Sequence, residues 1–153
     1  MLSAYKYRLY PSGAQEMRLK RSLHALCELY NTLRAERIQQ YQKNHQSLNR
    51  TGLRSLALQL RRNNPKLREV YSQVEQNVAD RVAIAFNNYF EGRARFPTSK
   101  KFKDYRSLTY PQSGFKLENG CLSLSRIGKV RILLHRPLRG TVRRLTIKYV
   151  VGE

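Results

Sequence analysis

The segment Ala4–Pro11, with the sequence Ala-Tyr-Lys-Tyr-Arg-Leu-Tyr-Pro, alternates between two kinds of side chain. In an extended strand these side chains would separate onto two faces. The faces are Tyr5, Tyr7 and Leu9 on one side, and Lys6, Arg8 and Tyr10 on the other. A lone strand is unstable, and convincing strand patterns resume only near Ser107. We therefore predict the first strand of a sheet that is completed after a long helical insertion.

The charge of the chain predicts a polyanionic partner. Its 153 residues include 30 Lys and Arg against 10 Asp and Glu, which gives a formal net charge of +20. Nucleic acid is the default partner of such a chain. An acidic membrane surface is the second choice, but we find neither a lipidation motif nor a long apolar run, and we predict no membrane partner. A ribosomal or RNA-packaging role is the third. Because the cations are spread along the chain, a folded binding surface is favoured over a disordered basic arm.

Neither catalysis nor metal binding is predicted for this chain. Cys27 and Cys121 lie far apart without a CxxC pattern, which indicates two reduced thiols in a cytoplasmic protein. The N-terminus lacks the apolar core of a signal peptide. No pair of carboxylates suited to two-metal chemistry can be assembled, and the three histidines have no triad partners in the sequence.

Residues 12–92 predict a helical bundle. Ser12 and Gln15 form a candidate capping box for a helix that extends to about Asn44. A second helix would be capped by Asn49 or Thr51 and end at Asn63-Asn64-Pro65. A short helical turn, Leu67–Tyr71, would precede a helix capped by Ser72 that ends at Glu91, before Gly92. Short turns between helices also suggest a helix-turn-helix motif, although the turn Arg62–Lys66 is long for it and contains proline.

Residues 93–106 form a basic junction without a clear apolar period. Its cations could neutralise phosphates while its aromatic residues stack on bases. The alternative is a solvated linker whose aromatic residues fill the seam between domains. The cations are Arg93, Arg95, Lys100, Lys101, Lys103 and Arg106, and the aromatic residues are Phe96, Phe102 and Tyr105.

From Ser107 onward the hydrophobic pattern has period two, which predicts short antiparallel strands. Asn119-Gly120 is a strong hairpin signal, and Val142–Val151 would be the last strand. We predict an α+β fold in which residues 1–11 and 107–153 close a small antiparallel barrel of the oligonucleotide-binding type. Nothing in the sequence covers the final strand, so we expect the chain to be the front portion of a longer protein.

Short motifs in a fixed order resemble the N-terminal half of the TnpB, or OrfB, family of transposon-encoded RNA-guided DNA endonucleases. They are Tyr5-Lys-Tyr-Arg-Leu-Tyr-Pro11, Leu29-Tyr-Asn31, Ser72-Gln73-xx-Gln76, Ala85-Phe-Asn-Asn-Tyr-Phe90, Arg93-Ala-Arg-Phe-Pro97, Ser107-Leu-Thr-Tyr-Pro111 and Leu124-Ser-Arg-Ile-Gly-Lys-Val130. The resemblance implies a wedge barrel interrupted by a helical recognition domain. It implies two partners, a guide RNA and double-stranded target DNA with a short target-adjacent motif, in a cytoplasmic, nucleoid-associated prokaryotic protein.

The resemblance also implies the residues that contact nucleic acid. Contacts to the adjacent motif are expected from Arg50, Arg54, Ser72, Gln73, Gln76 and Gln112. Contacts to the RNA backbone are expected from Lys6, Arg8, Arg93, Arg95, Lys100, Lys101, Lys103, Arg131, Arg136, Arg143 and Arg144. The family's nuclease domain, with its Mg²⁺ and structural Zn²⁺, would follow residue 153 and is itself a possible partner of this portion.

Three other functions remain open at this level. One is a nuclease-free descendant that represses transcription through a guide RNA. Another is a basic DNA- or RNA-binding module that uses no guide. A conventional transposase would need a catalytic tyrosine or an acidic trio, and no histidine pair for a metal accompanies any of the ten tyrosines.

Overall fold

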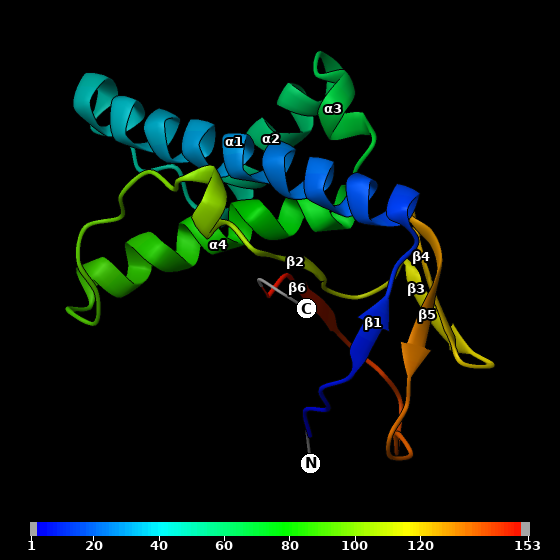
Figure 1. The fold of residues 1–153 in the computed structure, drawn as a ribbon. Coiled ribbons are helices and arrows are strands. Elements are labelled where there is room, and N and C mark those ends of the chain that lie inside the picture. The colour runs from blue at the N-terminus through cyan, green and yellow to red at the C-terminus, as the bar shows by residue number, and fades with distance from the viewer. Residues whose placement is uncertain (1–2, 151–153) are drawn as a thin grey trace.

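The computed structural model describes residues 3–150, in which four helices lie beside two small antiparallel sheets (Figure 1). The helices are α1 (Gly13–Asn44), α2 (Arg50–Arg62), α3 (Pro65–Arg68) and α4 (Ser72–Phe90), and a 3₁₀ turn covers Phe102–Asp104. The strands are β1 (Arg8–Tyr10), β2 (Ser107–Tyr110), β3 (Phe115–Glu118), β4 (Cys121–Leu124), β5 (Gly128–Leu133) and β6 (Leu145–Lys148). The α+β class is therefore confirmed.

Side-chain capping bonds fix where the first two helices begin. The Ser12 Oγ atom accepts the Gln15 backbone N–H at 3.2 Å, and the Gln15 side chain accepts the Ser12 backbone N–H at 2.9 Å. This reciprocal pair is the predicted capping box. Asn49 caps α2 by accepting the Gly52 backbone N–H at 2.9 Å, so the first of the two predicted caps is confirmed.

Two predictions around α3 and α4 are wrong. The short helix begins at Pro65, two residues before the predicted start, because Asn64 caps it and proline is favoured in the first helical position. Ser72 is the first residue of α4 rather than its cap. Tyr71 holds the cap position without a side-chain hydrogen bond, and its carbonyl accepts the first backbone bonds of the helix. The predicted end is confirmed, since Gly92 follows Glu91 with a φ of +76°.

Helices α1, α2 and α4 share one apolar core. Leu26, Leu33, Leu53 and Phe86 are almost completely buried in it. A buried ion pair joins α2 to α4, because Arg61 of α2 binds Glu75 of α4 at 2.9 Å. The same guanidinium donates to the backbone carbonyls of Leu67, within α3, and Val70, just after it, at 2.8 Å each.

The first strand pairs with strands from the other end of the chain. β1 runs antiparallel to β5, with Leu9 opposite Ile132, and the full order of this sheet is β1-β5-β4-β3 (Figure 1). The Asn119-Gly120 turn between β3 and β4 has positive φ at both residues, as predicted for a two-residue hairpin. The prediction that residues 4–10 complete a distant sheet is confirmed, although the paired strand covers only its last three residues.

The strands form two sheets rather than a closed barrel within residues 3–150. β2 pairs with β6 in a separate two-stranded ribbon, with Leu108 opposite Ile147. Residues 134–144, which include Pro137 and Gly140, adopt no strand and separate β5 from β6. The last strand is shorter than the predicted Val142–Val151, because its first three predicted residues belong to this segment and it ends at Lys148. Val151 lies outside the described residues.

Arginine side chains of the bundle fasten it to both sheets. Arg81 of α4 donates to the Ser107 carbonyl at 2.9 Å and to the Thr109 hydroxyl at 3.1 Å, which holds β2 against the helix. Arg18 of α1 donates to the Ile127 carbonyl at 3.0 Å, next to β5. These bonds satisfy backbone carbonyls at the seam between helices and sheets, where water would otherwise be needed.

We expect Gly114→Ala to destabilise the protein by about 2–4 kcal/mol. Gly114 has a φ of +90°, and an added Cβ would lie 2.4 Å from the ring of Tyr71. Chemical denaturation measures the loss. Gly140→Ala is the matched control, because Gly140 has a similar φ of +85° but no atom within 4 Å of an added Cβ. If the two variants lose the same stability, the contact between Gly114 and Tyr71 is not tight.

Candidate nucleic-acid interface

The outer face of the four-stranded sheet is cationic. Arg8, Lys129 and Arg131 alternate along β1 and β5 with apolar residues that face the core, and all three are exposed. Tyr10 lies beside Arg131 on this face and is 44% exposed, with the guanidinium 5.8 Å from its ring centroid. An exposed aromatic ring among cations can stack on a base while its neighbours neutralise phosphates. The sequence-based prediction included Arg8 and Arg131 but omitted Lys129.

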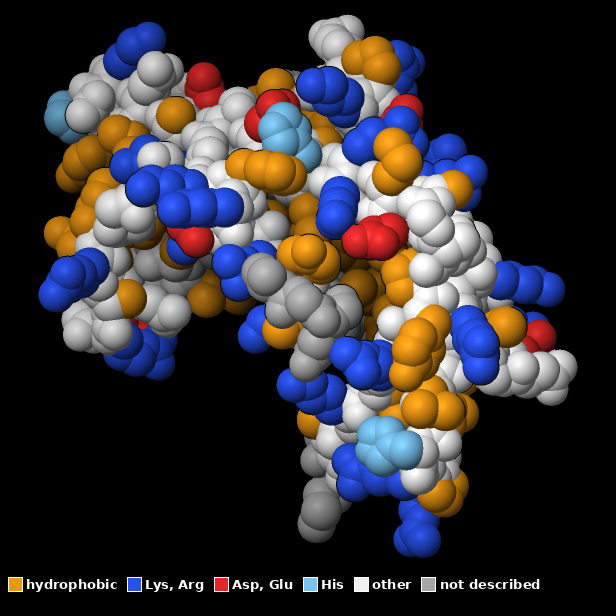
Figure 2. Space-filling model, viewed as in Figure 1, with side chains coloured by type: hydrophobic (Ala, Val, Ile, Leu, Met, Phe, Trp, Pro, Cys, Tyr) orange, Lys and Arg blue, Asp and Glu red, His pale blue; other side chains and the backbone are white. Residues whose placement is uncertain are grey.

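Two tyrosines and one arginine come together at the edge of this sheet, before β1. Tyr5 and Tyr7 stack on one another, and the Arg136 guanidinium lies 4.6 Å from the Tyr5 ring centroid. The Tyr7 hydroxyl donates to the Arg136 carbonyl at 3.0 Å, which joins the start of the chain to the segment after β5. Figure 2 shows Lys and Arg side chains spread over the visible face, with few acidic ones between them.

The basic junction is anchored on the bundle by its backbone and aromatic residues. Asn31 of α1 donates to the Lys100 carbonyl at 2.9 Å and accepts the Lys100 backbone N–H at 2.7 Å. Phe96 packs edge-on against Phe86 and Tyr89. Of the junction's aromatic residues, only Tyr105 is buried, whereas Phe96 is 44% and Phe102 51% exposed. Both alternatives for these residues therefore remain open, and the cations of the junction are exposed. One of those cations, Arg93, is paired with Glu91.

All eleven side chains expected to contact RNA are exposed: Lys6, Arg8, Arg93, Arg95, Lys100, Lys101, Lys103, Arg131, Arg136, Arg143 and Arg144. They gather in three places, namely the outer sheet face with its edge, the junction, and the segment that leads into β6. Exposure makes them available for phosphate contact but does not identify the ligand.

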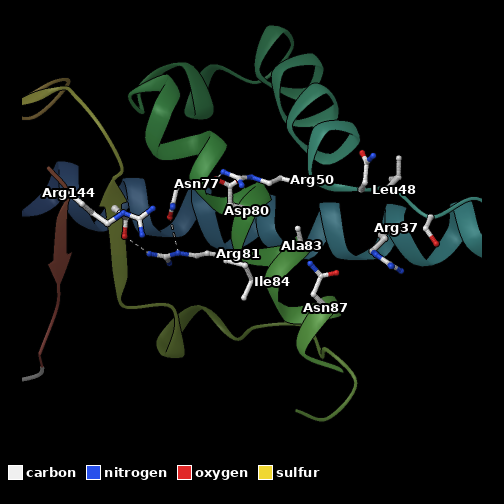
Figure 3. A pocket seen from close by; sticks show the side chains of 13 residues that line it. Arg37, Leu48, Arg50, Asn77, Asp80, Arg81, Ala83, Ile84, Asn87 and Arg144 are labelled. Carbon is white, nitrogen blue, oxygen red and sulfur yellow. Dashed lines mark hydrogen bonds and ion pairs between the residues drawn. The ribbon is translucent and has the colours of Figure 1, made fainter. Parts of the chain in front are cut away.

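A polar groove of about 690 Å³ runs along α4, between the segment before α2 and the ribbon of β2 and β6 (Figure 3). Its walls carry four arginines and one carboxylate. Figure 3 shows Arg144 at one end and Arg37 at the other, with Asp80 and Arg50 between them. The charged lining residues are Arg37, Arg50, Asp80, Arg81 and Arg144.

Asp80 organises two of the residues predicted to contact DNA. Its carboxylate accepts two hydrogen bonds from Arg54, both at 2.8 Å, and two from Arg50, at 2.9 and 3.3 Å. Burial of Asp80 works to raise its pKa, but the hydrogen bonds and charges of Arg54 and Arg50 outweigh it, so the pKa lies below its ordinary value. The ion cluster therefore joins α2 to α4 and fixes both guanidinium groups.

The free edge of Arg50 faces the groove. Arg50 uses its Nε and Nη2 atoms on Asp80, so the Nη1 hydrogens and one Nη2 hydrogen remain available. These donors form the end-on fork that matches a guanine edge or a phosphate. The Arg50 side chain is 63% exposed, against 39% for Arg54. Of the two arginines, Arg50 is the better placed to bind a ligand while it is still held by Asp80.

Of the polar residues predicted to contact DNA near the start of α4, Gln73 lies against the loop that carries Gln112. Gln73 accepts the Ser113 backbone N–H at 3.1 Å, and the hydroxyls of Tyr71 and Ser113 lie 2.9 Å apart. Gln112 is exposed in the same loop. Ser72 and Gln76 are half-buried on the helix. Gln73 is thus engaged in holding the loop, and Gln76 lies one turn before Asp80 on the same helix.

Sequence reasoning missed Asp80 and Arg37. The spacing of Asp80, four residues after Gln76, was a usable signal, because residues at this spacing share a helix face. Arg37 gave no such signal, since its place at the groove depends on how α1 packs against α4. Within residues 3–150 no group of three or more His, Cys, Asp or Glu could hold a metal ion, and no helix there could span a membrane.

Residues 1–46 match a family model described as a helix-turn-helix domain, that of OrfB from IS605. Of the matched residues, the structure describes 3–46, and these contain β1 and one helix, α1. The match supports the expected helix-turn-helix kinship, but at the start of the chain rather than around Arg62–Lys66.

Two curated relatives match most of the chain. InsQ of Escherichia coli K12 is 27% identical to this chain in an alignment of 156 positions, which covers 99% of the chain. A Streptomyces pristinaespiralis protein is 27% identical over 139 residues, which cover 88%. Each of these relatives carries the assignment of an RNA-guided DNA endonuclease. The chain spans only 39% and 35% of their respective lengths.

We expect Asp80→Asn to lower the free energy of unfolding by about 1–3 kcal/mol at pH 7, because the two arginines lose a charged acceptor. The lowered pKa of Asp80 means that its contribution is present above the ordinary carboxyl pKa and is lost as the pH falls through the lowered value. The difference between wild type and Asp80→Asn should therefore shrink in acid.

Urea unfolding at a series of pH values measures this difference. The matched control is Asp104→Asn, which removes an exposed carboxylate. A constant difference across the acidic range would show that the Asp80 charge is not what joins α2 to α4.

Proposed function

We propose that this chain, a relative of the TnpB or OrfB family, is the nucleic-acid-binding N-terminal portion of an RNA-guided DNA endonuclease. The observation that carries the proposal is the division of its cations. Arginines inside the scaffold, such as Arg61 and Arg81, are paired with protein groups, whereas every cation expected to bind RNA is exposed. A scaffold that keeps so much positive charge exposed on its surface is suited to a polyanion.

The guide RNA would lie against the sheet and the junction. Arg8, Lys129 and Arg131 are spaced along neighbouring strands, so one RNA backbone could contact several of them. Tyr10 offers a ring on which an unpaired base could stack. Contacts of this kind recognise the shape and the phosphate backbone of an RNA, and they do not depend on a long stretch of its base sequence.

The target DNA would lie against the start of α4 and the groove beside it. Gln76 could form a bidentate bond to adenine, and the free fork of Arg50 could do so to guanine. Both side chains lie on the side of the bundle where Asp80 joins α2 to α4. In this proposal a short adjacent motif is contacted by protein, while base pairing with the guide selects the rest of the target.

Strand cleavage would belong to a further, C-terminal portion of the parent protein. In this proposal Mg²⁺ and structural Zn²⁺ are bound there, and this portion presents the nucleic acids to that nuclease. Such a role places the protein with the nucleoid in a prokaryotic cytoplasm.

The RNA that co-purifies with the chain tests the proposal directly. The chain should be expressed beside the ends of its native element, purified at moderate salt, and its bound RNA sequenced. We expect one defined transcript from an element end. Mixed cellular RNA would contradict guiding and favour a basic nucleic-acid-binding module, and the absence of RNA would contradict the role of the sheet and junction.

We expect Gln76→Ala to reduce discrimination at one base pair of the adjacent motif by about 1–3 kcal/mol, because a bidentate contact to a base edge is lost. Competition binding with duplexes that differ at single positions of the motif measures the effect. Gln59→Ala, on the exposed side of α2, is the control and should change nothing. An equal loss for all duplexes would make Gln76 a scaffold or phosphate contact.

A further inference from the structure

Arg37 is the most deeply buried arginine in the wall of the groove. It projects from α1 toward α4, and only 9% of its surface is exposed. Its guanidinium carbon lies 4.1 Å from the ring centroid of Phe86 and 5.4 Å from that of Phe90. The side chain therefore lies on an aromatic platform at one end of the groove (Figure 3).

The guanidinium of Arg37 has no hydrogen-bond or ion-pair partner among residues 3–150, in contrast to Arg50 and Arg81 of the same groove wall. Arg50 is bound by Asp80, and Arg81 donates to Asn77, Ser107 and Thr109. No carboxylate, carbonyl or amide oxygen in the described part of the chain accepts a hydrogen bond from Arg37. Burial alone lowers the pKa of Arg37, and no acidic neighbour opposes it.

Although most of the Arg37 side chain is buried, none of its nitrogen atoms is completely shielded from solvent, so its unpaired N–H groups open into the groove. Water or a ligand in the groove can accept hydrogen bonds from them. Packing on the Phe86 ring holds the guanidinium in place but uses none of its N–H groups. The groove carries four arginines, and its single carboxylate is already occupied by two of the chain's arginines. An anion is the complement that such a site lacks.

We propose that the Arg37 end of this groove is a phosphate site for a nucleic-acid backbone, with Arg37 held on Phe86 as its principal donor. The inference rests on the proposed function for the source of the phosphate, but not for the existence of the anion site. Asn87 lines the same end and supplies an amide donor. A backbone that lies along α4 would meet Arg37 at one end of the groove and Arg144 at the other (Figure 3).

The test uses Arg37→Met, which keeps an unbranched apolar side chain against Phe86 and removes the charge. Arg62→Met is the matched control, because Arg62 is exposed at the end of α2 and does not line the groove. Thermal unfolding of the wild type and both variants is compared in sodium phosphate and in sodium chloride of equal ionic strength. Binding of a labelled DNA duplex is then measured as a function of salt concentration.

We expect phosphate to raise the Tm of the wild type and of Arg62→Met by the same amount, and that of Arg37→Met by clearly less. In chloride, Arg37→Met should be as stable as the wild type or more stable, because one of four like charges in the groove wall is removed. Its affinity for the duplex should fall by roughly tenfold. The slope of log K against log salt should fall by about one, as for one lost phosphate contact.

Two results would overturn the proposal. Equal stabilisation of wild type and Arg37→Met by phosphate would show that Arg37 binds no anion. Loss of the phosphate effect with unchanged duplex affinity and salt slope would show that the site is not used by a nucleic-acid backbone. A wild-type chain that binds no duplex at all would contradict the proposed function, and the phosphate comparison would still decide whether the anion site exists.

Discussion

The pairing of β1 with β5 is the constraint on which the rest of the structure depends. Only three residue pairs join the two strands, yet the whole helical bundle lies between them in the chain. Closing so long a loop costs conformational entropy, which three backbone pairs alone cannot offset. Two side chains of α1 reinforce this pairing. Gln15 donates to the Lys129 carbonyl within β5, and Arg18 donates to the Ile127 carbonyl just before it.

Arginine has two separate roles in this protein, and the net charge of +20 conceals the difference. Some guanidinium groups act as fasteners: Arg61 ties α2 to α4, and Arg81 ties α4 to β2. Their planar forks satisfy several carbonyl and hydroxyl oxygens at once, which lysine could not do in the same geometry. The exposed arginines and lysines remain for a ligand. Asp80 serves both roles, since it fixes Arg54 within the scaffold and orients Arg50 at the groove.

Features that depend on neighbouring residues could be predicted from the sequence. The Ser12 capping box, the Asn119-Gly120 turn and the stop at Gly92 each follow from local chemistry, and the alternation of residues 4–10 placed the right side chains on the right faces. The inserted helices followed from the change in hydrophobic period. The exposure of the basic side chains followed from their number and spread.

Features that depend on tertiary geometry could not be predicted. Periodicity does not show whether six short strands form one barrel or two sheets, since the answer depends on how residues 134–144 leave β5. It also does not show that Arg50 and Arg54 share a carboxylate 30 and 26 residues away, or that Gln73 holds a loop. Their role as DNA contacts stays a prediction, and the partners that these side chains have in the structure could not be foreseen.

The most direct test of this architecture is the detection of nuclear Overhauser effects between backbone protons of β1 and β5 in the labelled chain. The structure predicts cross-peaks that join Arg8 to Leu133, Leu9 to Ile132 and Tyr10 to Arg131. Cross-peaks that join residues 8–10 to other partners, or to none after residue 106, would contradict the sheet that holds the bundle and its cations in place.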